Sequence, residues 1–403
     1  MTKPLEGIRV LDCTVWFQGP VSSQYLADFG AEVIHVERPS SGDPARGVRS
    51  IKALEIGDWN QYFLVINRNK KSIEIDMRSE AGQQLFYKMI EKADVFLWNQ
   101  GMGNLRKWNL TWEKLREINP RLIHATNTGH GQKGHVEKPS FDINVQALTG
   151  IMARQGEPGQ PPIYLGMGSG DAYGGIMSAF AIMMALYQRK KTGRGQSIDA
   201  SLYGAQLFMG APTLQPFLAS KKEFYSMQRS RKEAANPLWN RYEAQDKWLY
   251  LCQANDDPSF AKVCEALEQP DLVSDARFAS APERAQNNEA LIAELDGIFA
   301  KKSAQDWMDR FTPAGIAASP IVSFKELSED PQAWANDYLL KTWCSEVDRE
   351  VEIRGLPVTL SKTPGSVETL GPELGQDTEI ILMDMLGMEW EQIEELKSQG
   401  VIP

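Results

Sequence analysis

Short apolar runs alternate with segments of helical spacing along the first third of the chain. The runs of strand type cover residues 8–12, 32–37, 72–76, 95–98 and 122–126, and the helical segments cover 22–29, 80–92 and 112–118. Strands that are separated by helices are typical of parallel β-α-β units. The pattern therefore predicts an α/β fold with a parallel sheet.

A later block of the chain predicts two apolar helices on either side of a short strand. Residues 171–191 are almost continuously apolar until they end in Arg189, Lys190 and Lys191, which Gly193 follows closely. Cations in the last turn and a glycine just beyond it are typical of a helix end. Residues 197–200 then predict a strand, and residues 202–218 predict the second apolar helix.

The chain changes character near residue 219. Residues 219–235 are charged and polar, which predicts a linker. Beyond it we expect a smaller α+β unit, with a hairpin over 242–252 that turns at Asp246-Lys247 and helices over 258–267, 287–300 and 304–311. The tail from about residue 332 predicts short strands and two final helices, near Asp377 and Glu389.

The composition is that of an ordinary globular protein and excludes several functional classes. Of 403 residues, 42% are hydrophobic and 24% are charged, and the net charge is −10. Disorder is excluded, and an acidic surface argues against nucleic acid as a partner. The longest apolar stretch, residues 176–187, is shorter than the roughly 20 residues that span a bilayer, so no membrane partner is expected. The four cysteines form no CxxC pair, and we expect a soluble, cytoplasmic protein.

Motifs of several common sites are missing. The turn after the first strand runs from Thr14 to Pro20 without the G-x-G-x-x-G pattern, so NAD is not expected there, and Gly19-Pro20 predicts a tight turn before a helix. His130 and His135 lie five residues apart in a glycine-rich segment, without a carboxylate-histidine cluster. No metal site is therefore expected. The chain also lacks a G-x-S-x-G elbow.

Basic residues gather in the α/β half of the sequence, mostly just after predicted strands. They are Arg38, Arg46, Arg49, Arg68, Lys70, Lys71 and Arg78. Open α/β sheets bind ligands at the edge where their strands end, so this cluster is a candidate site for a phosphate-rich ligand. A solvated charged surface is the alternative for each residue taken singly.

The segment from Gly166 to Gly175 has five glycines besides Asp171 and opens the long apolar helix. One interpretation is that Asp171 caps the helix by accepting a hydrogen bond from the free backbone amides. The other is that Asp171 stays ionised at the helix N-terminus and attacks an activated carbonyl. Glycines in the first helical turn cost about 1 kcal/mol each relative to alanine, and five glycines in ten residues favour close approach of another chain or a ligand to the backbone.

With these residues the sequence resembles the class III CoA-transferases, of the formyl-CoA transferase and carnitine-CoA transferase type. The resemblance covers nearly the whole chain. It includes PLEGIRVLDCT and LADFGAEVIHVERPSSGDPARG, then NRNKKSIEIDM and NPRLIHATNTGHGQ, and most specifically GDAYGG followed by TGRGQSIDASL.

The resemblance implies that Asp171 is the catalytic nucleophile. In that family the aspartate attacks an acyl-CoA thioester, forms a mixed anhydride and is then converted to an aspartyl-CoA thioester. CoA esters are the substrates, and no permanently bound cofactor or metal is implied.

The resemblance also implies where CoA and the acyl group bind. Contacts to CoA are expected from Phe17, Gln18, Arg38, Ile75, Met77, Arg78, Asn99, Gln100, Gly101 and Lys107. Substrate contacts are expected from the loop with Ser140, Phe141 and Asp142, which transferases of the family use. Trp16 and Trp239 are further candidates, and together with Phe141 they suggest an apolar or aromatic acyl group, with core packing as the alternative for each.

Some positions depart from the family pattern. Gln18 is displaced by one residue from the glutamine of formyl-CoA transferase, and the glycine-rich active-site loop before residues 236–239 is missing. We therefore expect a carnitine-like, aromatic or branched acyl group rather than oxalate or formate. An α-methylacyl-CoA racemase is the alternative enzyme of the same fold, but phenylalanine at 141 replaces its acid/base histidine. A CoA-ester-binding protein without turnover is the second alternative.

The resemblance further predicts the domain organisation. A Rossmann-like α/β domain is expected over 1–220, a linker and small α+β domain over 221–330, and a C-terminal segment over 331–403 that returns to the large domain. Members of the family form interlocked homodimers, so a homodimer is expected here.

Overall fold

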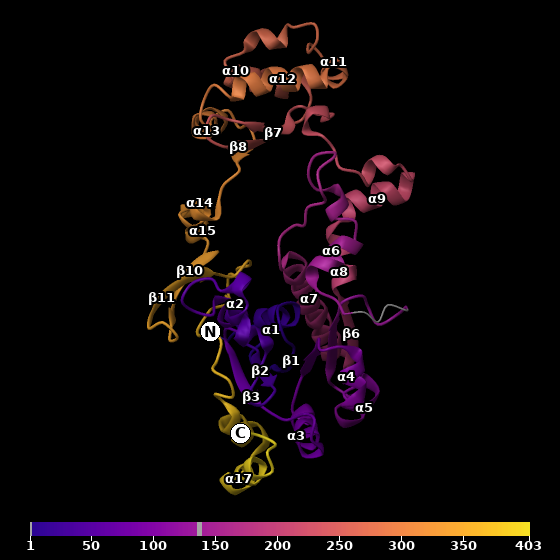
Figure 1. Ribbon diagram of the computed structural model, residues 1–403, viewed down its shortest axis with the longest axis vertical. Coiled ribbons are helices and arrows are strands. Elements are labelled where there is room, and N and C mark those ends of the chain that lie inside the picture. The colour runs from indigo at the N-terminus through magenta and orange to yellow at the C-terminus, as the bar shows by residue number, and fades with distance from the viewer. Residues whose placement is uncertain (1, 135–138) are drawn as a thin grey trace. The chain divides into compact units, whose positions relative to one another are not determined.

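The computed structural model describes residues 2–134 and 139–403 (Figure 1). The chain divides into two compact units. The first comprises Met1–Met152, Tyr164–Lys221 and Pro331–Pro403, and the second comprises Ala153–Ile163 and Lys222–Asp330. The short segment Ala153–Ile163 thus belongs with the second unit, although its place in the sequence suggests the first.

The first unit is built on a six-stranded sheet. Its strands are β1 Arg9–Cys13, β2 Glu32–Glu37, β3 Lys70–Glu74, β4 Val95–Trp98, β5 Ile123–Thr128 and β6 Gln196–Ser201. They lie in the order β3-β2-β1-β4-β5-β6, and every described pairing is parallel. The predicted α/β fold with a parallel sheet is confirmed.

Nine α-helices among the described residues connect or flank these strands. They are α1 Gln18–Asp28, α2 Gln61–Ile66, α3 Glu80–Glu91, α4 Met102–Lys107, α5 Trp112–Ile118, α6 Asp142–Leu148, α7 Ser169–Thr192, α8 Leu202–Met209 and α9 Ala211–Ser220.

Neighbouring residues of each central strand bury on opposite faces of the sheet. Leu11, Ile34 and Phe96 pack with α3, α4 and α5 on one face. Val10, Val33 and Val95 pack with α1 and α7 on the other. Because both faces are covered, the strands read as continuous apolar runs, which explains why the sequence predicts them well.

Helix boundaries differ from prediction in two places. Helix α1 begins at Gln18 rather than at residue 22. Its first turn can include Pro20, because an N–H in the first turn of a helix has no partner within the helix and its loss costs no hydrogen bond. Gly19 is required at this position, since a Cβ would lie 2.3 Å from Thr14 Cβ. The single helix expected over 202–218 is two helices, which Gly210 separates.

The C-terminal segment packs on the first unit. It contains α15 Pro331–Ala335, β10 Leu339–Cys344, β11 Arg349–Arg354, α16 Thr378–Leu386 and α17 Trp390–Ser398. The β10–β11 hairpin buries Cys344 and Val351 with Val65 of α2. Further on, the segment accepts hydrogen bonds from Asn69 and Asp76 at Thr369 and Val401, and so covers the edge strand β3.

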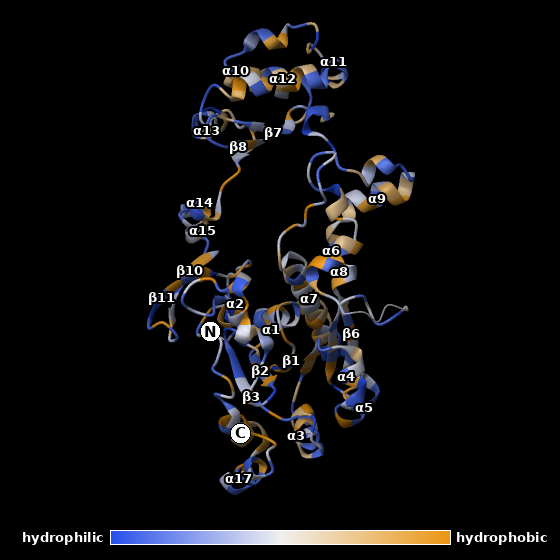
Figure 2. Cartoon of the chain, viewed as in Figure 1, coloured by the Kyte–Doolittle hydropathy of each residue, from blue (hydrophilic) through white to orange (hydrophobic). Residues whose placement is uncertain are grey.

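The second unit is a small α+β module. Its strands β7 Trp239–Glu243, β8 Trp248–Cys252 and β9 Ala318–Pro320 form an antiparallel sheet. Its helices are α10 Asp257–Ala266, α11 Ala281–Gln286, α12 Asn288–Phe299, α13 Ala304–Phe311 and α14 Phe324–Ser328. Helices α10 and α12 mix hydrophobic and hydrophilic residues along their length (Figure 2). Their apolar sides enclose an aromatic core in which Tyr242 stacks on Phe299 at 4.7 Å. The predicted hairpin is confirmed.

The contact between α1 and α7 depends on glycine and yields a stability prediction. A Cβ on Gly175 would lie 2.8 Å from the Gln18 carbonyl oxygen, so we expect Gly175→Ala to lower the free energy of unfolding by about 1–3 kcal/mol. Gly297→Ala is the control, since this glycine of α12 has nothing within 4 Å of the added Cβ. That change should stabilise by up to about 1 kcal/mol, as alanine favours the helix. Urea unfolding monitored by circular dichroism measures both, and equal effects would contradict the packing argument.

Candidate functional site

The carboxyl ends of the strands in the first unit carry most of the predicted site. The strand order changes direction between β1 and β4, and open α/β sheets bind ligands at this switch point. The loops that follow β1, β2, β3 and β4 contain the residues for which a CoA contact is predicted.

Asp171 lies in the first turn of α7. Gly168 is the N-cap residue, with φ of 81°, and Asp171 is the third residue of the helix. The interpretation of Asp171 as the capping residue is therefore wrong. The left-handed Gly168 allows the loop to enter the helix without a side-chain cap, which leaves the carboxylate of Asp171 available for another role.

The glycines around Asp171 allow side chains and helices to pack against the backbone. A Cβ on Gly170 would lie 2.0 Å from Gln206 Nε2 and 2.2 Å from Asp142 Oδ1. A Cβ on Gly174 would lie 2.9 Å from Gln18 Nε2. The close approach that the sequence predicts at these positions is thus made by the chain's own residues.

Asp171 has an unusual electrostatic environment. Burial, and then the negative charge of Asp142, raise the pKa of Asp171 from 3.8 to about 7. A helix N-terminus favours a carboxylate by only about 0.3–1 kcal/mol, whereas each unit of pKa corresponds to about 1.4 kcal/mol. Burial and the charge of Asp142 therefore outweigh the effect of the helix end on the pKa of Asp171. That Asp171 is ionised when it reacts stays a prediction.

Asp142 is held by two side-chain amides. Gln146 Nε2 donates to Asp142 Oδ2 and Gln206 Nε2 donates to Asp142 Oδ1, both at 3.0 Å. All three side chains are buried. The sequence analysis missed both glutamines. The i, i+4 spacing of Asp142 and Gln146 could have suggested that pair, but no local signal connects Gln206 to it.

Two aromatic side chains lie next to this acidic pair. The rings of Phe17 and Tyr62 are 5.4 Å apart, and Phe17 lies 3.9 Å from the position of a Cβ on Gly168. Burial, followed by the charge of Asp171, raises the pKa of Tyr62 well above its ordinary value. Phe17 is thus placed at the start of α7, and Tyr62 is a site neighbour that the sequence analysis missed.

The turn after β1 is fixed by polar side chains from two other loops. Trp16 has a left-handed φ of 68°, and its N–H donates to Asp43 Oδ1. Asn99 accepts from the Val15 N–H and donates to the Val15 carbonyl oxygen. Asn99 and Trp16 are therefore brought together, with Asn99 engaged by the backbone.

Two other predicted CoA contacts are also engaged by the backbone. Gln18 Nε2 donates to the carbonyl of Ala200 at 3.2 Å, and Gln100 Nε2 donates to the carbonyl of Cys13 at 2.8 Å. Their amides hold the loops near β1 in place, and a role toward CoA stays a prediction.

A cavity of about 290 Å³ gathers several predicted CoA residues at the ends of β2, β3 and β4. Its lining includes Arg38, Ile75, Met77, Arg78 and Gln100. Hydrophobic walls beside an exposed arginine are suited to a nucleotide ring and its phosphates.

Most of the basic cluster has structural partners instead. Arg46 pairs with Glu37, Arg68 with Asp28, Lys70 with Asp12, Lys71 with Glu32, Arg49 with Glu346 and Arg78 with Asp76. The pairs of Arg68 and Lys70 are fully buried. Arg68 and Lys70 therefore belong neither to a phosphate site nor to a solvated charged surface, since each forms an ion pair in the core.

A larger cavity of about 660 Å³ lies at the ends of β4 and β5. It is lined by Asn99, Gly101 and Ser140, together with Gly129, Gly131 and Gly134. Glycines without side chains let a ligand approach the backbone here, although the Gly131 N–H already donates to Thr128 Oγ1.

The remaining predicted residues are more dispersed. Phe141 is 68% exposed, and Lys107 is exposed at the end of α4. Trp239 begins β7 of the second unit, so its contact with substrate stays a prediction. His135 lies outside the described residues, and within them no group of three or more His, Cys, Asp or Glu side chains could hold a metal ion.

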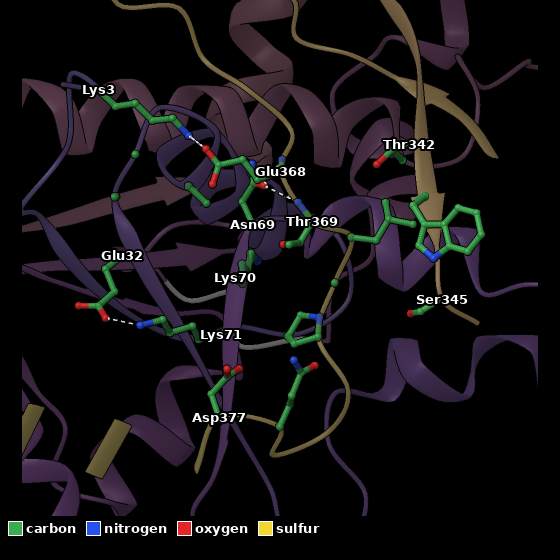
Figure 3. Close-up of a pocket in the computed structure, with 18 of the residues that line it drawn as sticks. Lys3, Glu32, Asn69, Lys70, Lys71, Thr342, Ser345, Glu368, Thr369 and Asp377 are labelled. Atoms are coloured by element: carbon green, nitrogen blue, oxygen red, sulfur yellow. Dashed lines mark hydrogen bonds and ion pairs between the residues drawn. The ribbon is translucent and has the colours of Figure 1, made fainter. Parts of the chain in front are cut away.

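The largest cavity lies away from these residues. It has a volume of about 880 Å³ and is lined by residues at the amino ends of β2 and β3 and by the C-terminal segment. Figure 3 shows its lysines facing acidic partners, with Lys3 bonded to Glu368 and Lys71 bonded to Glu32. Its cations are therefore engaged by the protein itself.

A buried charge cluster lies below the turn after β1. His35 is 3.4 Å from Asp12 and 3.8 Å from both Glu37 and Asp43, while Lys70 is 2.9 Å from Asp12. Although burial acts to lower the pKa of His35, the carboxylates of Glu37 and Asp12 raise it above 6.5. The proton on His35 therefore stabilises the packed carboxylates.

Comparison with known proteins defines the class. The chain matches CoA-transferase family III over residues 5–378. It is 33% identical to the succinyl-CoA–D-citramalate CoA-transferase of Chloroflexus aurantiacus, over 99% of this chain and 98% of that protein. It is 31% identical to the succinyl-CoA:glutarate CoA-transferase of Mus musculus, over 99% and 90%. It is 34% identical to the acetyl-CoA:oxalate CoA-transferase of Acetobacter aceti, over 84% and 86%.

The fold agrees with these relationships. The crystal structure of a CAIB/BAIF family protein from Brucella suis matches with a TM-score of 0.83 and 29% identity, over 96% of this chain and all of that chain. The chain belongs to CoA-transferase family III and is an enzyme of that class. Among its described helices, none is both long and apolar enough to cross a membrane.

The His35 cluster yields a prediction for the pH dependence of stability. A raised folded pKa contributes stability that is fully present below pH 6.5 and is lost as the pH rises through that pKa. We expect His35→Gln to destabilise the protein at pH 5.5, by about 1.4 kcal/mol for each unit of the shift, and to have less effect at pH 9. Urea unfolding at both pH values measures this.

His124 provides a control of opposite sign. Burial lowers its pKa, so its contribution is lost as the pH falls, and His124→Gln should give the smaller destabilisation at pH 5.5. A difference between wild type and His35→Gln that is the same at both pH values would overturn the assignment.

Proposed function

We propose that this CoA-transferase moves CoA reversibly between carboxylic acids through covalent intermediates on Asp171. The position of Asp171 is the observation that supports this most strongly. The carboxylate lies in the first turn of α7, partly buried, beside the second carboxylate of Asp142. Burial next to a like charge makes Asp171 more basic and hence a better nucleophile than an ordinary carboxylate.

The proposed reaction balances without a redox or metal cofactor. An oxygen of Asp171 attacks the thioester carbonyl, the C–S bond breaks, and CoA thiolate leaves a mixed anhydride. The thiolate then attacks the aspartyl carbonyl and displaces the donor acid as its carboxylate. The acceptor carboxylate attacks the resulting aspartyl thioester and restores an anhydride. Thiolate finally attacks the acceptor carbonyl of that anhydride, forms the new CoA ester and releases Asp171.

Asp142 favours the covalent stages of this sequence. Acylation converts Asp171 from a carboxylate to a neutral ester-like group, which removes the repulsion between the two carboxylates. The cavities at the ends of β2 to β5 are the proposed places for CoA. The contacts to CoA and to the acyl group that the sequence predicts remain proposals.

We propose short dicarboxylic acids as the acyl groups. The relatives described above are named for succinate, citramalate, glutarate and oxalate. Of the carnitine-like, aromatic or branched groups that the sequence suggests, a branched one has a counterpart among them, since citramalate carries a methyl branch. A racemase is disfavoured because Phe141 offers no ionisable group.

We also propose a homodimer, supported by one face of α7. This helix buries Gly175, Ile182 and Leu186 against its own chain. Its other face exposes Ile176, Phe180, Met183, Met184 and Tyr187 by 40–64%. A helix that is apolar all round is normally buried all round, and a second copy would cover this face. The cytoplasmic location stays a prediction from the four scattered cysteines.

The covalent mechanism predicts the effect of Asp171→Asn. The amide cannot attack the thioester, so CoA exchange between succinyl-CoA and a panel of dicarboxylates should fall by about 10³-fold or more. After hydroxylamine treatment, mass spectrometry should find a hydroxamate at Asp171 only in wild type. Asp384→Asn, at an exposed position of α16, is the control and should retain activity. Exchange by Asp171→Asn close to that of wild type would exclude the mechanism.

The dimer predicts a concentration-dependent mass. Phe180→Asp combined with Met184→Lys places charges in the exposed apolar face, so we expect the dimer to dissociate. Analytical ultracentrifugation compares the masses. The control is a double substitution at Gln188 and Lys190, two exposed polar residues of the same helix, which should leave the dimer intact. A wild-type protein that sediments as a monomer at micromolar concentration would contradict the proposal.

A further inference from the structure

The Asp142 carboxylate is fixed by helices that come from distant parts of the sequence. One oxygen accepts from Gln146 of α6 and the other from Gln206 of α8. Asp142 is 5% exposed, and neither glutamine has measurable exposure. Each oxygen of Asp142 thus accepts from a buried amide, which fixes the orientation of the side chain.

The two glutamines differ in what else holds them. Gln146 Oε1 accepts from the Leu165 N–H, and its Nε2 also donates to the Gly166 carbonyl. The loop before α7 therefore fixes the orientation of this amide. Gln206 Oε1 is buried and has no hydrogen-bond partner among the described residues. Only the negative charge of Asp142 favours the observed orientation of Gln206, since the exchanged amide would present oxygen to oxygen.

Gln206 also touches the backbone that carries the nucleophile. Its Nε2 lies 2.0 Å from the position of a Cβ on Gly170, the residue before Asp171. An unsatisfied buried oxygen costs free energy, so this arrangement has a stability cost. The cost indicates that the amide serves the site rather than the core.

We propose that Gln206 is a positioning residue for the nucleophile: it holds the Asp142 side chain immobile against the first turn of α7, so that Asp171 reacts beside a fixed carboxylate. This inference rests on the proposed function of Asp171. Two groups interact electrostatically with Asp171. Asp142 of α6 acts on it as a like charge, and the charge of Asp171 in turn raises the pKa of Tyr62 of α2. Gln206 acts through the first of these.

The test measures the protonation of Asp171 without any CoA substrate. A water-soluble carbodiimide activates protonated carboxyl groups, and mass spectrometry measures amine coupling to Asp171 as a function of pH. Coupling in the wild-type protein should fall with a midpoint near pH 7. In Gln206→Met the Asp142 side chain loses one of its two side-chain donors and is no longer held against α7. Its repulsion of Asp171 then weakens, and the midpoint should fall by about one pH unit.

Further variants test whether Gln206 acts on Asp171 through Asp142. Asp142→Asn removes the charge and should lower the midpoint at least as far, and Gln206→Met added to it should produce no additional shift, because Gln206 acts through Asp142. Gln24→Met is the matched control. Gln24 is equally buried and donates to Asp28 at 3.0 Å, so this variant should lose stability without moving the midpoint.

The outcomes separate this proposal from the proposed function. An unchanged midpoint in Gln206→Met would overturn the positioning role, as would an equal shift in Gln24→Met or a further shift in the double variant. If Gln206→Met does not fold, Gln206→Ala removes the same donor and carries the same expectation. A shifted midpoint in a protein that forms no Asp171 adduct with any CoA ester would support the positioning of Asp171 and refute the transferase mechanism.

Discussion

The close contact between α1 and α7 is the constraint on which the candidate site depends. Gly175 lets α7 approach the Gln18 carbonyl, and Gly174 makes room for the Gln18 side chain. At this distance the turn after β1, with Phe17, lies beside the loop that enters α7. A side chain at either glycine would separate Asp171 from the strand ends where ligands bind in α/β sheets. The GDAYGG sequence thus serves packing and chemistry together, and its glycines place Asp171 as much as they give it freedom.

Charge in this unit is arranged in two contrasting ways. Beneath the turn after β1, three carboxylates are balanced by Lys70, Arg46 and His35. At the start of α7, Asp142 and Asp171 face each other with amides rather than cations around them. The first arrangement stabilises a rigid turn, whereas the second raises the energy of the free carboxylate. Perturbed titration near a cavity is typical of functional groups, and in the second arrangement burial and a like charge raise the pKa of Asp171 to about 7.

The sequence predicted the sheet better than it predicted the surroundings of Asp171. Residues 32–37 and 95–98 form strands with the expected bounds, because burial on both faces makes the apolar runs continuous. Asp171 could be singled out because its motif is local. Gln206 and Tyr62 could not, since their contact with the acidic pair exists only after α8 and α2 have packed. Gln18, Asn99 and Gln100 were predicted to contact CoA, but each side-chain amide donates to a backbone carbonyl of the protein. The sequence could not show this, because a backbone carbonyl satisfies such an amide as readily as a ligand does.

The covering of β3 by the C-terminal segment has a consequence for the order of folding during synthesis. Strand β3 forms one edge of the sheet, and the C-terminal segment covers it. The Asp377 N–H donates to the Ser72 carbonyl, and Thr369 and Val401 make backbone contacts just before and after the strand. A ribosome completes those residues only after the whole second unit has emerged. The nascent sheet therefore exposes an unprotected β edge for most of translation, when such edges pair readily with other chains. The last three dozen or so residues protect this edge only at the end of synthesis. Chains truncated before them would be prone to aggregate even with every active-site residue present.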